Sequence, residues 1–255
     1  MFRYLLYGTI FYLIFVILTL PADVSYAYWK KHWGQRERIV LSGIDGSVWS
    51  GTVSQAMIQG QPVQDLKWEF KPMKLFLGKL EAELEFTVPD GFGKGKVGYG
   101  VLGGAYAKDV EAWVPLTVLA RFVNLAALRP GGKLNINMKS VNYKNGVVSN
   151  AFGNLAWLDA EITLFQPVAL GNFELNLTTD DKGVNGELKD KGGPLQSEAK
   201  ILLAENGDYS IDGEVMLRDS SRRDLQQALQ NMGRPNAKGQ IPLKQKGNLK
   251  QLGLM

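Results

Sequence analysis

The sequence predicts a mainly β protein, with a single N-terminal transmembrane helix followed by a twisted, curved and mostly antiparallel sheet domain that includes two short helices. Three observations lead to this fold class. One long apolar stretch lies near the N-terminus, most of the remaining chain alternates apolar and polar residues with a period of two, and turn residues divide the alternating stretches at short intervals. Glycine accounts for 29 of the 255 residues, above its usual share of about 7%, as expected for a chain rich in strands and turns.

Residues 4–20 form the predicted transmembrane helix. They carry no charged side chain, and about 17–25 apolar residues suffice to cross the hydrocarbon core of a bilayer. Aromatic residues flank the stretch on both sides, as in the interfacial belts of membrane proteins. A cleaved signal peptide with its site at Ser25-Tyr26-Ala27 is the alternative. Its apolar region would exceed the usual length of about 7–15 residues, which favours a retained anchor.

The charges beside this helix indicate its orientation. Arg3 lies directly at its N-terminal end, whereas Lys30 lies ten residues beyond Leu20. A simple count of Lys and Arg favours the opposite orientation, but long domains are translocated largely regardless of charge. We therefore expect a cytoplasmic tail of residues 1–3, a membrane-proximal linker of residues 21–38, and a β-rich domain of residues 39–255 on the other side of the membrane.

The clearest strand spans residues 80–88. Apolar residues alternate with glutamates there, which indicates one buried and one solvated face: Leu80, Ala82, Leu84, Phe86 and Val88 against Glu81, Glu83 and Glu85. Similar alternation occurs at residues 134–138, 173–177 and 209–217. Turn sequences separate such stretches, namely Pro89-Asp90-Gly91, Pro130-Gly131-Gly132, Asn145-Gly146, Asp181-Lys182-Gly183 and Asn206-Gly207-Asp208. Short strands at this spacing favour an antiparallel architecture over one built of βαβ units.

Two short helices are predicted within the sheet domain, near residues 115–125 and 221–232. Pro115 suits the first helical turn, and the residues after it form one apolar stripe: Leu116, Leu119, Phe122 and Val123. The second helix is expected to begin at a Ser220 or Ser221 cap and to end at Gly233. Its apolar stripe consists of Leu225, Leu229 and Met232.

A short internal repeat suggests a duplication. Residues 51–56 and 146–151 share the pattern G-x-V-S-x-A, and each is followed by a Trp and then a Pro. A true duplication would divide the domain into two similar sheet units joined near residues 105–130. A chance match of six residues is the alternative, because such matches arise easily in β-rich chains.

The distribution of charge argues against a nucleic-acid-binding protein. The whole chain carries 29 Lys and Arg against 25 Asp and Glu. Residues 1–38 have a net charge of +3 and residues 233–255 a net charge of +5, which leaves −4 for the rest. A nucleic-acid binder concentrates positive charge on its folded domain, and this chain does the opposite.

No residue set in the sequence predicts catalysis. The chain has no cysteine, which excludes thiol nucleophiles, and its one histidine, His32, excludes a metal site built of several histidines. Gly93, Gly95 and Gly98 match G-x-G-x-x-G, but a dinucleotide site needs a helix after this loop. Here the residues alternate as in a strand, with Lys96, Gly98 and Gly100 on one face and Val97, Tyr99 and Val101 on the other. We therefore expect a protein that is not an enzyme, with no catalytic, cofactor-binding or metal-binding residues and no cofactor.

Two segments carry a resemblance to a known family. Leu41-Ser42-Gly43-Ile44-Asp45-Gly46-Ser47-Val48-Trp49-Ser50-Gly51 is similar to the G-[ST]-x-W-x-G signature that follows the anchor in protein N of the type II (general) secretion system. The segment Leu66-Lys67-Trp68 … Pro72 … Leu75 … Gly78-Lys79-Leu80 resembles the second recurring feature of that family. A looser similarity connects this second arrangement to AsmA-like proteins. Gly46, Trp49 and Gly51 are interpreted as residues that determine a tight turn rather than as a binding site.

The resemblance implies a function and a location. We expect a non-catalytic accessory component of type II protein secretion, anchored in the bacterial inner membrane by a single span, with its N-terminus in the cytoplasm and its C-terminal domain in the periplasm. Its partners would be other inner-membrane and periplasmic secretion components and membrane lipids, with no nucleic acid. Sheet-edge addition, an apolar helix stripe and the basic tail would make these contacts.

The AsmA-like similarity implies an alternative function. The periplasmic domain would then be a lipid-binding or lipid-conducting groove. Such a groove needs an open apolar face, because burial of an acyl chain gains about 0.8 kcal/mol for each methylene. Three sets of strand residues are the expected liners: Val97, Tyr99 and Val101; Leu134, Ile136 and Met138; and Phe173, Leu175 and Leu177.

Overall fold

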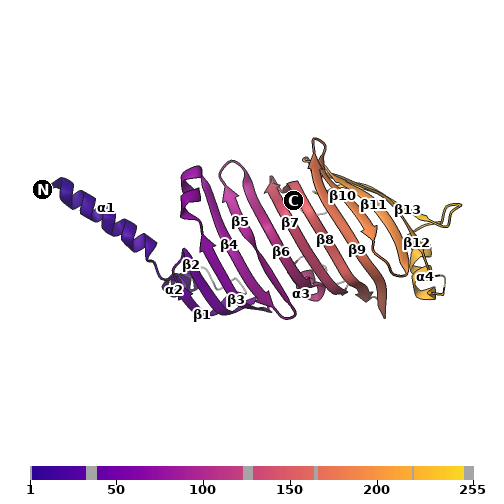
Figure 1. The fold of residues 1–255 in the computed structure, drawn as a ribbon, viewed down its shortest axis with the longest axis horizontal. Coiled ribbons are helices and arrows are strands. Elements are labelled where there is room, and N and C mark those ends of the chain that lie inside the picture. The colour runs from indigo at the N-terminus through magenta and orange to yellow at the C-terminus, as the bar shows by residue number, and fades with distance from the viewer. Residues whose placement is uncertain (1, 33–38, 123–128, 164–165, 220, 250–255) are drawn as a thin grey trace. The chain divides into compact units, whose positions relative to one another are not determined.

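The computed structural model describes residues 2–32, 39–122, 129–163, 166–219 and 221–249. The chain divides into two compact units, residues 1–89 and 90–255. Within each unit the described strands are antiparallel, and each strand lies beside its neighbours in the chain (Figure 1). The prediction of a mainly β protein with antiparallel strands and few short helices is confirmed.

The first unit contains two N-terminal helices and a four-stranded antiparallel sheet. Its elements are α1 (Phe2–Leu18), α2 (Ala22–His32), β1 (Ile39–Gly46), β2 (Ser50–Ile58), β3 (Gln61–Phe70), the 3₁₀ helix η1 (Pro72–Leu77) and β4 (Lys79–Val88).

The second unit contains a nine-stranded antiparallel sheet and two helices among its described residues. Its elements are β5 (Gly91–Gly100), β6 (Gly104–Pro115), α3 (Leu116–Phe122), β7 (Pro130–Lys144), β8 (Val147–Thr163), β9 (Pro167–Asp180), β10 (Gly183–Asp190), β11 (Leu195–Leu203), β12 (Asp208–Leu217), α4 (Arg223–Met232) and β13 (Ile241–Asn248).

Helix α1 covers most of the predicted anchor. Among the described residues, none of the helices reaches the combined length and hydrophobicity that a membrane crossing requires. The anchor at residues 4–20 therefore stays a prediction. Part of the predicted linker at residues 21–38 is helical, since α2 spans Ala22–His32. Its sequence suits a helix, because Asp23 lies in the first turn and Lys30 and Lys31 lie in the last, where each charge complements the helix dipole.

Strand β4 confirms most of the alternation at residues 80–88, with two corrections. Leu80, predicted on the buried face, is 46% exposed, and it lies before Ala82, where the register with β3 begins. Ala82 and Val88 are buried, and Glu85 is exposed on the opposite face, as predicted. Glu81 is not solvated, because only 6% of its surface is exposed. The segment around η1 covers it: the Lys71 N–H donates to the Glu81 carbonyl oxygen at 2.8 Å, and Lys74 Nζ lies 4.0 Å from its carboxylate. Alternation alone could not reveal this cover, because η1 comes from outside the strand.

Both predicted short helices form, although their starts differ from the prediction. Pro115 is the last residue of β6, so α3 begins one residue later. Helix α4 begins after Arg222 and has no side-chain cap, so the expected cap at Ser221 is wrong. Bidentate hydrogen bonds from Arg222 to Asp224, at 2.9 and 2.6 Å, stand beside this start instead. Ser220 and Val123 lie outside the described residues.

The predicted turns also form, with one exception. Asp90 and Asn145 adopt positive φ in the tight turns before β5 and β8. Pro130, Gly131 and Gly132 instead lie at the start of β7, where Gly132 takes a φ of 86° beside a register shift. A Cβ on Gly132 would lie 2.4 Å from two carbonyl oxygens of β8, so glycine permits a close approach there rather than a turn.

The internal repeat does not correspond to two equivalent units. The division of the chain falls at residues 89 and 90, whereas the predicted junction at residues 105–130 lies within the second unit. Trp68 lies on β3, one strand after the first copy of the repeat, but Trp157 lies on β8, the strand of the second copy. The shared feature is local: Val53 and Ala56, and later Ala151, are buried in their sheets.

Apolar side chains of the second unit gather on one face of its sheet. The register places Leu134, Trp157 and Phe173 in one row, Ile136, Leu155 and Leu175 in the next, and Met138, Gly153 and Leu177 in a third. Helix α4 covers part of this face, because Leu225 and Leu229 are buried with Leu195, Val215 and Ile241. The buried faces of strands and helix therefore form one core cluster at the C-terminal end of the unit.

An ionic cluster closes the connection between β10 and β11. Asp190 Oδ1 accepts a hydrogen bond from the Ser197 N–H at 2.9 Å, and Oδ2 accepts from Arg218 Nη2 at 2.9 Å and the Gly192 N–H at 3.2 Å. Arg218 Nη1 donates to two carbonyl oxygens of the connection, of Gly193 and Leu195. Burial is the largest influence and opposes ionisation, but these hydrogen bonds together hold the pKa of Asp190 below its ordinary value.

Candidate interaction site

The signature segment forms the hairpin between β1 and β2. Ser47 closes it, because its Oγ accepts hydrogen bonds from the N–H groups of Trp49 and Ser50, each at 3.2 Å. The Ser47 N–H donates to the Ser50 carbonyl oxygen at 2.8 Å. The backbone N–H groups in this tight turn need an acceptor, and the serine hydroxyl supplies it.

Both signature glycines are required by close backbone contacts. Gly46 has a φ of 96°, and a Cβ on it would lie 2.5 Å from the Ser50 carbonyl oxygen. A Cβ on Gly51 would lie 2.5 Å from both the Asp45 carbonyl oxygen and Cζ2 of Trp68. The interpretation of these glycines as residues that determine a tight turn is consistent with this geometry.

The hairpin also joins two separate segments of the first unit. The Val48 N–H donates to the Leu20 carbonyl oxygen at 3.0 Å, just after α1. Trp68 Nε1 donates to the Val48 carbonyl oxygen at 3.0 Å, and the Phe70 N–H donates to the Trp49 carbonyl oxygen at 2.6 Å. The signature therefore links the end of α1 to the end of β3 through its backbone, which gives the hairpin a structural role.

The outer edge of β1 is partly occupied by α2. The Tyr26 hydroxyl accepts a hydrogen bond from the Leu41 N–H at 3.0 Å and donates to the Ile39 carbonyl oxygen at 3.4 Å. One side chain thus satisfies two backbone groups that an incoming strand would need. Sequence reasoning missed this role of Tyr26, because the contact joins residues that lie 13 and 15 positions apart in the chain.

The opposite end of the strand order is β13, and no described strand pairs with its outer edge. Residues 241–248 belong to the basic tail expected at residues 233–255, so the structure places about a third of that tail in a sheet. Lys244 and Lys246 are exposed, and Pro242 removes one backbone donor. Residues 250–255, including Lys250, lie outside the described residues.

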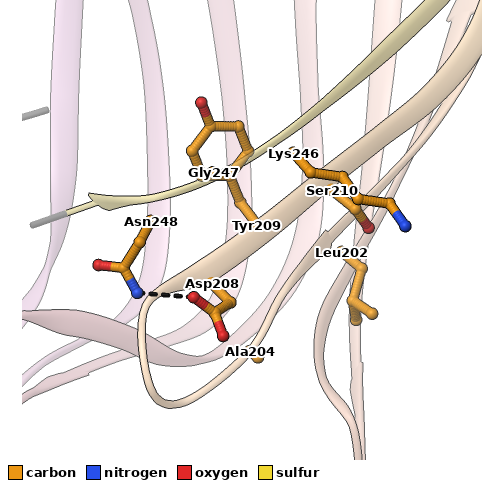
Figure 2. A pocket seen from close by; sticks show the side chains of 8 residues that line it. All are labelled: Leu202, Ala204, Asp208, Tyr209, Ser210, Lys246, Gly247 and Asn248. Atoms are coloured by element: carbon orange, nitrogen blue, oxygen red, sulfur yellow. Dashed lines mark hydrogen bonds between the residues drawn. The ribbon is translucent and has the colours of Figure 1, made fainter. Parts of the chain in front are cut away.

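A shallow depression of about 490 Å³ lies beside this edge strand (Figure 2). It lies among β11, β12 and β13, and its lining combines apolar, hydroxyl and charged groups: Leu202, Ala204, Asp208, Tyr209, Ser210, Lys246, Gly247 and Asn248. Figure 2 shows Asn248 directed at Asp208, and this hydrogen bond measures 2.7 Å. Tyr209 lies over Gly247, where a Cβ would lie 2.8 Å from the Tyr209 hydroxyl oxygen.

The lining of the depression contains one acidic and one basic side chain, Asp208 and Lys246. Hydrogen bonds to the Asp208 carboxylate, first from Asn248 and then from Asn206, hold its pKa below the ordinary value. Lys246 approaches the same depression from β13. Such a surface can receive a polar side chain from a strand that pairs with β13, but it brings together no nucleophile and base. Sequence reasoning missed it because its members come from three strands.

The expected groove liners have mixed positions. Leu134, Ile136, Phe173, Leu175 and Leu177 are half-buried on one face, and Met138 is buried there. Val97 and Tyr99 are exposed on β5, but Val101 lies in the turn after that strand, so its assignment to the strand is wrong.

Two other predicted features have definite places. The G-x-G-x-x-G letters lie within β5, as the strand interpretation predicted, and a Cβ on Gly95 would lie 3.0 Å from Val110. The α4 stripe is not available to a partner, because Leu225 and Leu229 are buried in the core. In the part of the chain that the structure describes, no three acidic or histidine side chains are grouped as a metal site.

Comparison with known proteins identifies the family of this chain. The family model described as "Type II secretion system (T2SS), protein N" matches residues 37–244. A type II secretion system protein N from Aeromonas hydrophila is 28% identical over 244 residues, which cover 93% of this chain and 94% of that protein. The protein of the same description from Vibrio cholerae serotype O1 is 27% identical over 251 residues, covering 95% and 98% of the two chains. No solved structure matches this chain. The family match spans most of the chain and includes the whole signature hairpin, and the chain therefore belongs to the type II secretion system protein N family.

Proposed function

We propose that this protein is a non-catalytic accessory component of type II secretion that binds other secretion components through the free edge of β13. Family membership supports the secretion role. The observation that carries the mode of binding is the contrast between the two edges. Tyr26 occupies backbone groups of β1, whereas β13 has no described strand on its outer side.

The chemistry of β13 defines the partner strand. Lysines and proline on an edge oppose pairing between identical copies, because two positively charged edges repel one another. Lys244 and Lys246 would instead attract an acidic strand. The main chain of that strand would supply affinity, and the depression beside Lys246 would receive one of its side chains. We therefore propose an acidic extended segment of a secretion component as the partner.

Photocrosslinking in cells tests this proposal. A photoreactive amino acid replaces Lys246 on β13, and a matched variant carries it at Lys200, which is exposed on β11, two strands from the edge. We expect position 246 to capture a component of the secretion machinery, identified by mass spectrometry, and position 200 to capture none. Equal capture at both positions, or capture of no secretion component at 246, would refute edge binding.

The proposed location is the inner membrane, with residues 4–20 as the anchor and the β-rich units in the periplasm. The uncharged sequence of residues 4–20 and the adjacent Arg3 support this arrangement. Protease added to spheroplasts should digest the β-rich units. Protection of these units until the cells are lysed would reverse the proposed topology.

The apolar rows of the second unit favour a second candidate function, the binding of lipid acyl chains. One row consists of Ile136, Leu155 and Leu175, which lie side by side on β7, β8 and β9 and are only half-buried. Native mass spectrometry of the detergent-extracted protein would show a co-purifying phospholipid that Leu175→Glu removes. Asn176→Glu places the same charge at the next residue, which is exposed, and should leave the lipid in place. A lipid-free protein that still binds its secretion partner would end this alternative.

A further inference from the structure

The segment that contains η1 has an inverted distribution of polar and apolar side chains. Phe76 is 85% exposed, and Met73, Leu75 and Leu77 are exposed beside it. The polar groups lie on the other side, where Lys74 approaches Glu81, which is buried. An ordinary surface helix buries its apolar face and exposes its charges. Here the arrangement is reversed.

This segment is held in place on both sides, so the exposure is a fixed feature. Pro72 restricts the backbone at the first helical position, and Gly78 ends the helix in the left-handed conformation with a φ of 65°. Lys71 ties the start to β4 through its N–H bond to Glu81. Its Nζ also pairs with Glu69 at 2.6 Å and with Glu83 at 3.3 Å, contacts that raise the pKa of Lys71, chiefly through Glu69.

The backbone places η1 at the same end of the first unit as the end of α1. The Leu20 carbonyl oxygen accepts from Val48, and the Trp49 carbonyl oxygen accepts from Phe70, two residues before η1 begins. The signature hairpin therefore connects these two segments by backbone hydrogen bonds. Figure 1 shows the short coil of η1 between the ends of β3 and β4. If α1 is inserted in a bilayer, η1 lies close to the surface of that bilayer.

The charge of the segment selects one occupant for its apolar face. Residues 71–79, Lys-Pro-Met-Lys-Leu-Phe-Leu-Gly-Lys, contain three lysines and no acidic residue. Lys71 and Lys74 face glutamates of β3 and β4, and Lys79 is the lysine exposed beside the apolar side chains. Lysines around exposed aromatic and aliphatic side chains are typical of segments that lie in the interface of an anionic membrane, because the amines reach the headgroups while the apolar groups enter the acyl boundary. Lys79 is exposed at the end of the segment and available for this contact.

We propose that η1 is a membrane-contact element that inserts Met73, Phe76 and Leu77 into the interface of an anionic lipid bilayer, next to the anchor. The inference rests on the proposed anchor at residues 4–20. It assigns a role to the second recurring segment, residues 66–80, which the proposed edge binding does not use. The hairpin would then connect the sheet to two membrane-contacting segments, α1 and η1, instead of to α1 alone.

Site-directed spin labelling of the full chain tests this inference, and the absence of native cysteine makes single labels straightforward. The variants are Phe76→Cys in η1, Gln64→Cys as an exposed control on β3, and Tyr12→Cys within α1. Gln64 lies six residues before Phe70, about 20 Å from that end of the strand. Each labelled chain is reconstituted into vesicles of phosphatidylcholine and phosphatidylglycerol. Collision of the label with oxygen, which concentrates in lipid, is compared with collision with a water-soluble nickel chelate.

The three positions separate failure of this inference from failure of the anchor. We expect the labels at 12 and 76 to collide mainly with oxygen and the label at 64 mainly with the nickel chelate. A label at 76 that matches the one at 64, while 12 remains in lipid, would overturn membrane contact by η1 and leave the anchor intact. Aqueous labels at both 12 and 76 would overturn the anchor and, with it, this inference. Adding Lys79→Gln to the 76-labelled chain should weaken the immersion of the label roughly fivefold, and only in vesicles that contain the anionic lipid.

Discussion

Replacement of Gly46 by alanine should destabilise the first unit through a specific clash in the signature hairpin. The residue has a φ of 96°, and the new Cβ would lie 2.5 Å from the Ser50 carbonyl oxygen and 2.7 Å from Gly51 Cα. Left-handed backbone costs a residue with a side chain about 1–2 kcal/mol. Separation of the overlapping atoms requires movement of the hairpin, which adds about 2 kcal/mol by comparison with overpacked sites.

Gly60→Ala is the matched control, because Gly60 occupies the next hairpin with a φ of 80° and has no atom within 4 Å of the position of a Cβ. Both variants incur the backbone strain, and only Gly46→Ala incurs the clash. With a change of roughly 2–4 °C in Tm for each kcal/mol in a chain of this size, Gly46→Ala should melt about 4–8 °C below Gly60→Ala. Thermal unfolding followed by far-ultraviolet circular dichroism measures the difference. Equal melting temperatures would refute the assignment of Gly46 as a position required by close contact.

Three further substitutions test the rest of the fold. Asp190→Asn should lower stability at neutral pH by about 2 kcal/mol, because the charged acceptor for Arg218 is lost. The pKa of Asp190 is lowered in the folded chain. Its contribution to the free energy of unfolding is therefore complete above the ordinary carboxyl pKa of about 4 and disappears as pH falls through the lower folded pKa. Urea denaturation should thus give the two chains similar stabilities in acid and different stabilities near neutral pH. Leu225→Ala should cost about 2–4 kcal/mol by urea denaturation, since its side chain is buried, whereas Gln226→Ala, exposed on the same helix, should cost less than about 0.5 kcal/mol; similar losses would contradict the packing of α4. Trp68→Phe should lower the stability of the first unit by about 1 kcal/mol through loss of the indole hydrogen bond to Val48, and an unchanged midpoint would show that this bond contributes nothing.

Local patterns predicted much of the architecture. The alternation in residues 80–88 predicted β4, and the Asn145-Gly146 pair predicted the turn before β8, because both signals depend on neighbouring residues alone. The stripe of Leu225 and Leu229 predicted a helix with one buried face. The same patterns failed where a distant segment intervenes. Glu81 belongs to a polar face by alternation, yet the segment around η1 covers it.

The β13 edge and the depression beside it could be identified only from tertiary contacts. Lys244 and Lys246 formed a basic tail in the sequence, and only strand pairing with β12 made them the edge of a sheet. The depression beside them combines residues of β11, β12 and β13, so no local motif could predict it. The cover of the other edge by Tyr26 likewise joins residues fifteen positions apart.

The sequence by itself determined the β class, the hairpin signature and the family, because these depend on residue type and spacing along the chain. The apolar stretch of residues 4–20 and the glycines of the hairpin are properties that each segment carries alone. The tertiary structure decided which edge is free, which apolar stripe is buried in α4 and which apolar segment, η1, faces outward. These features result from packing between segments that lie far apart in the chain. The pattern of a single segment cannot predict which other segment packs against it.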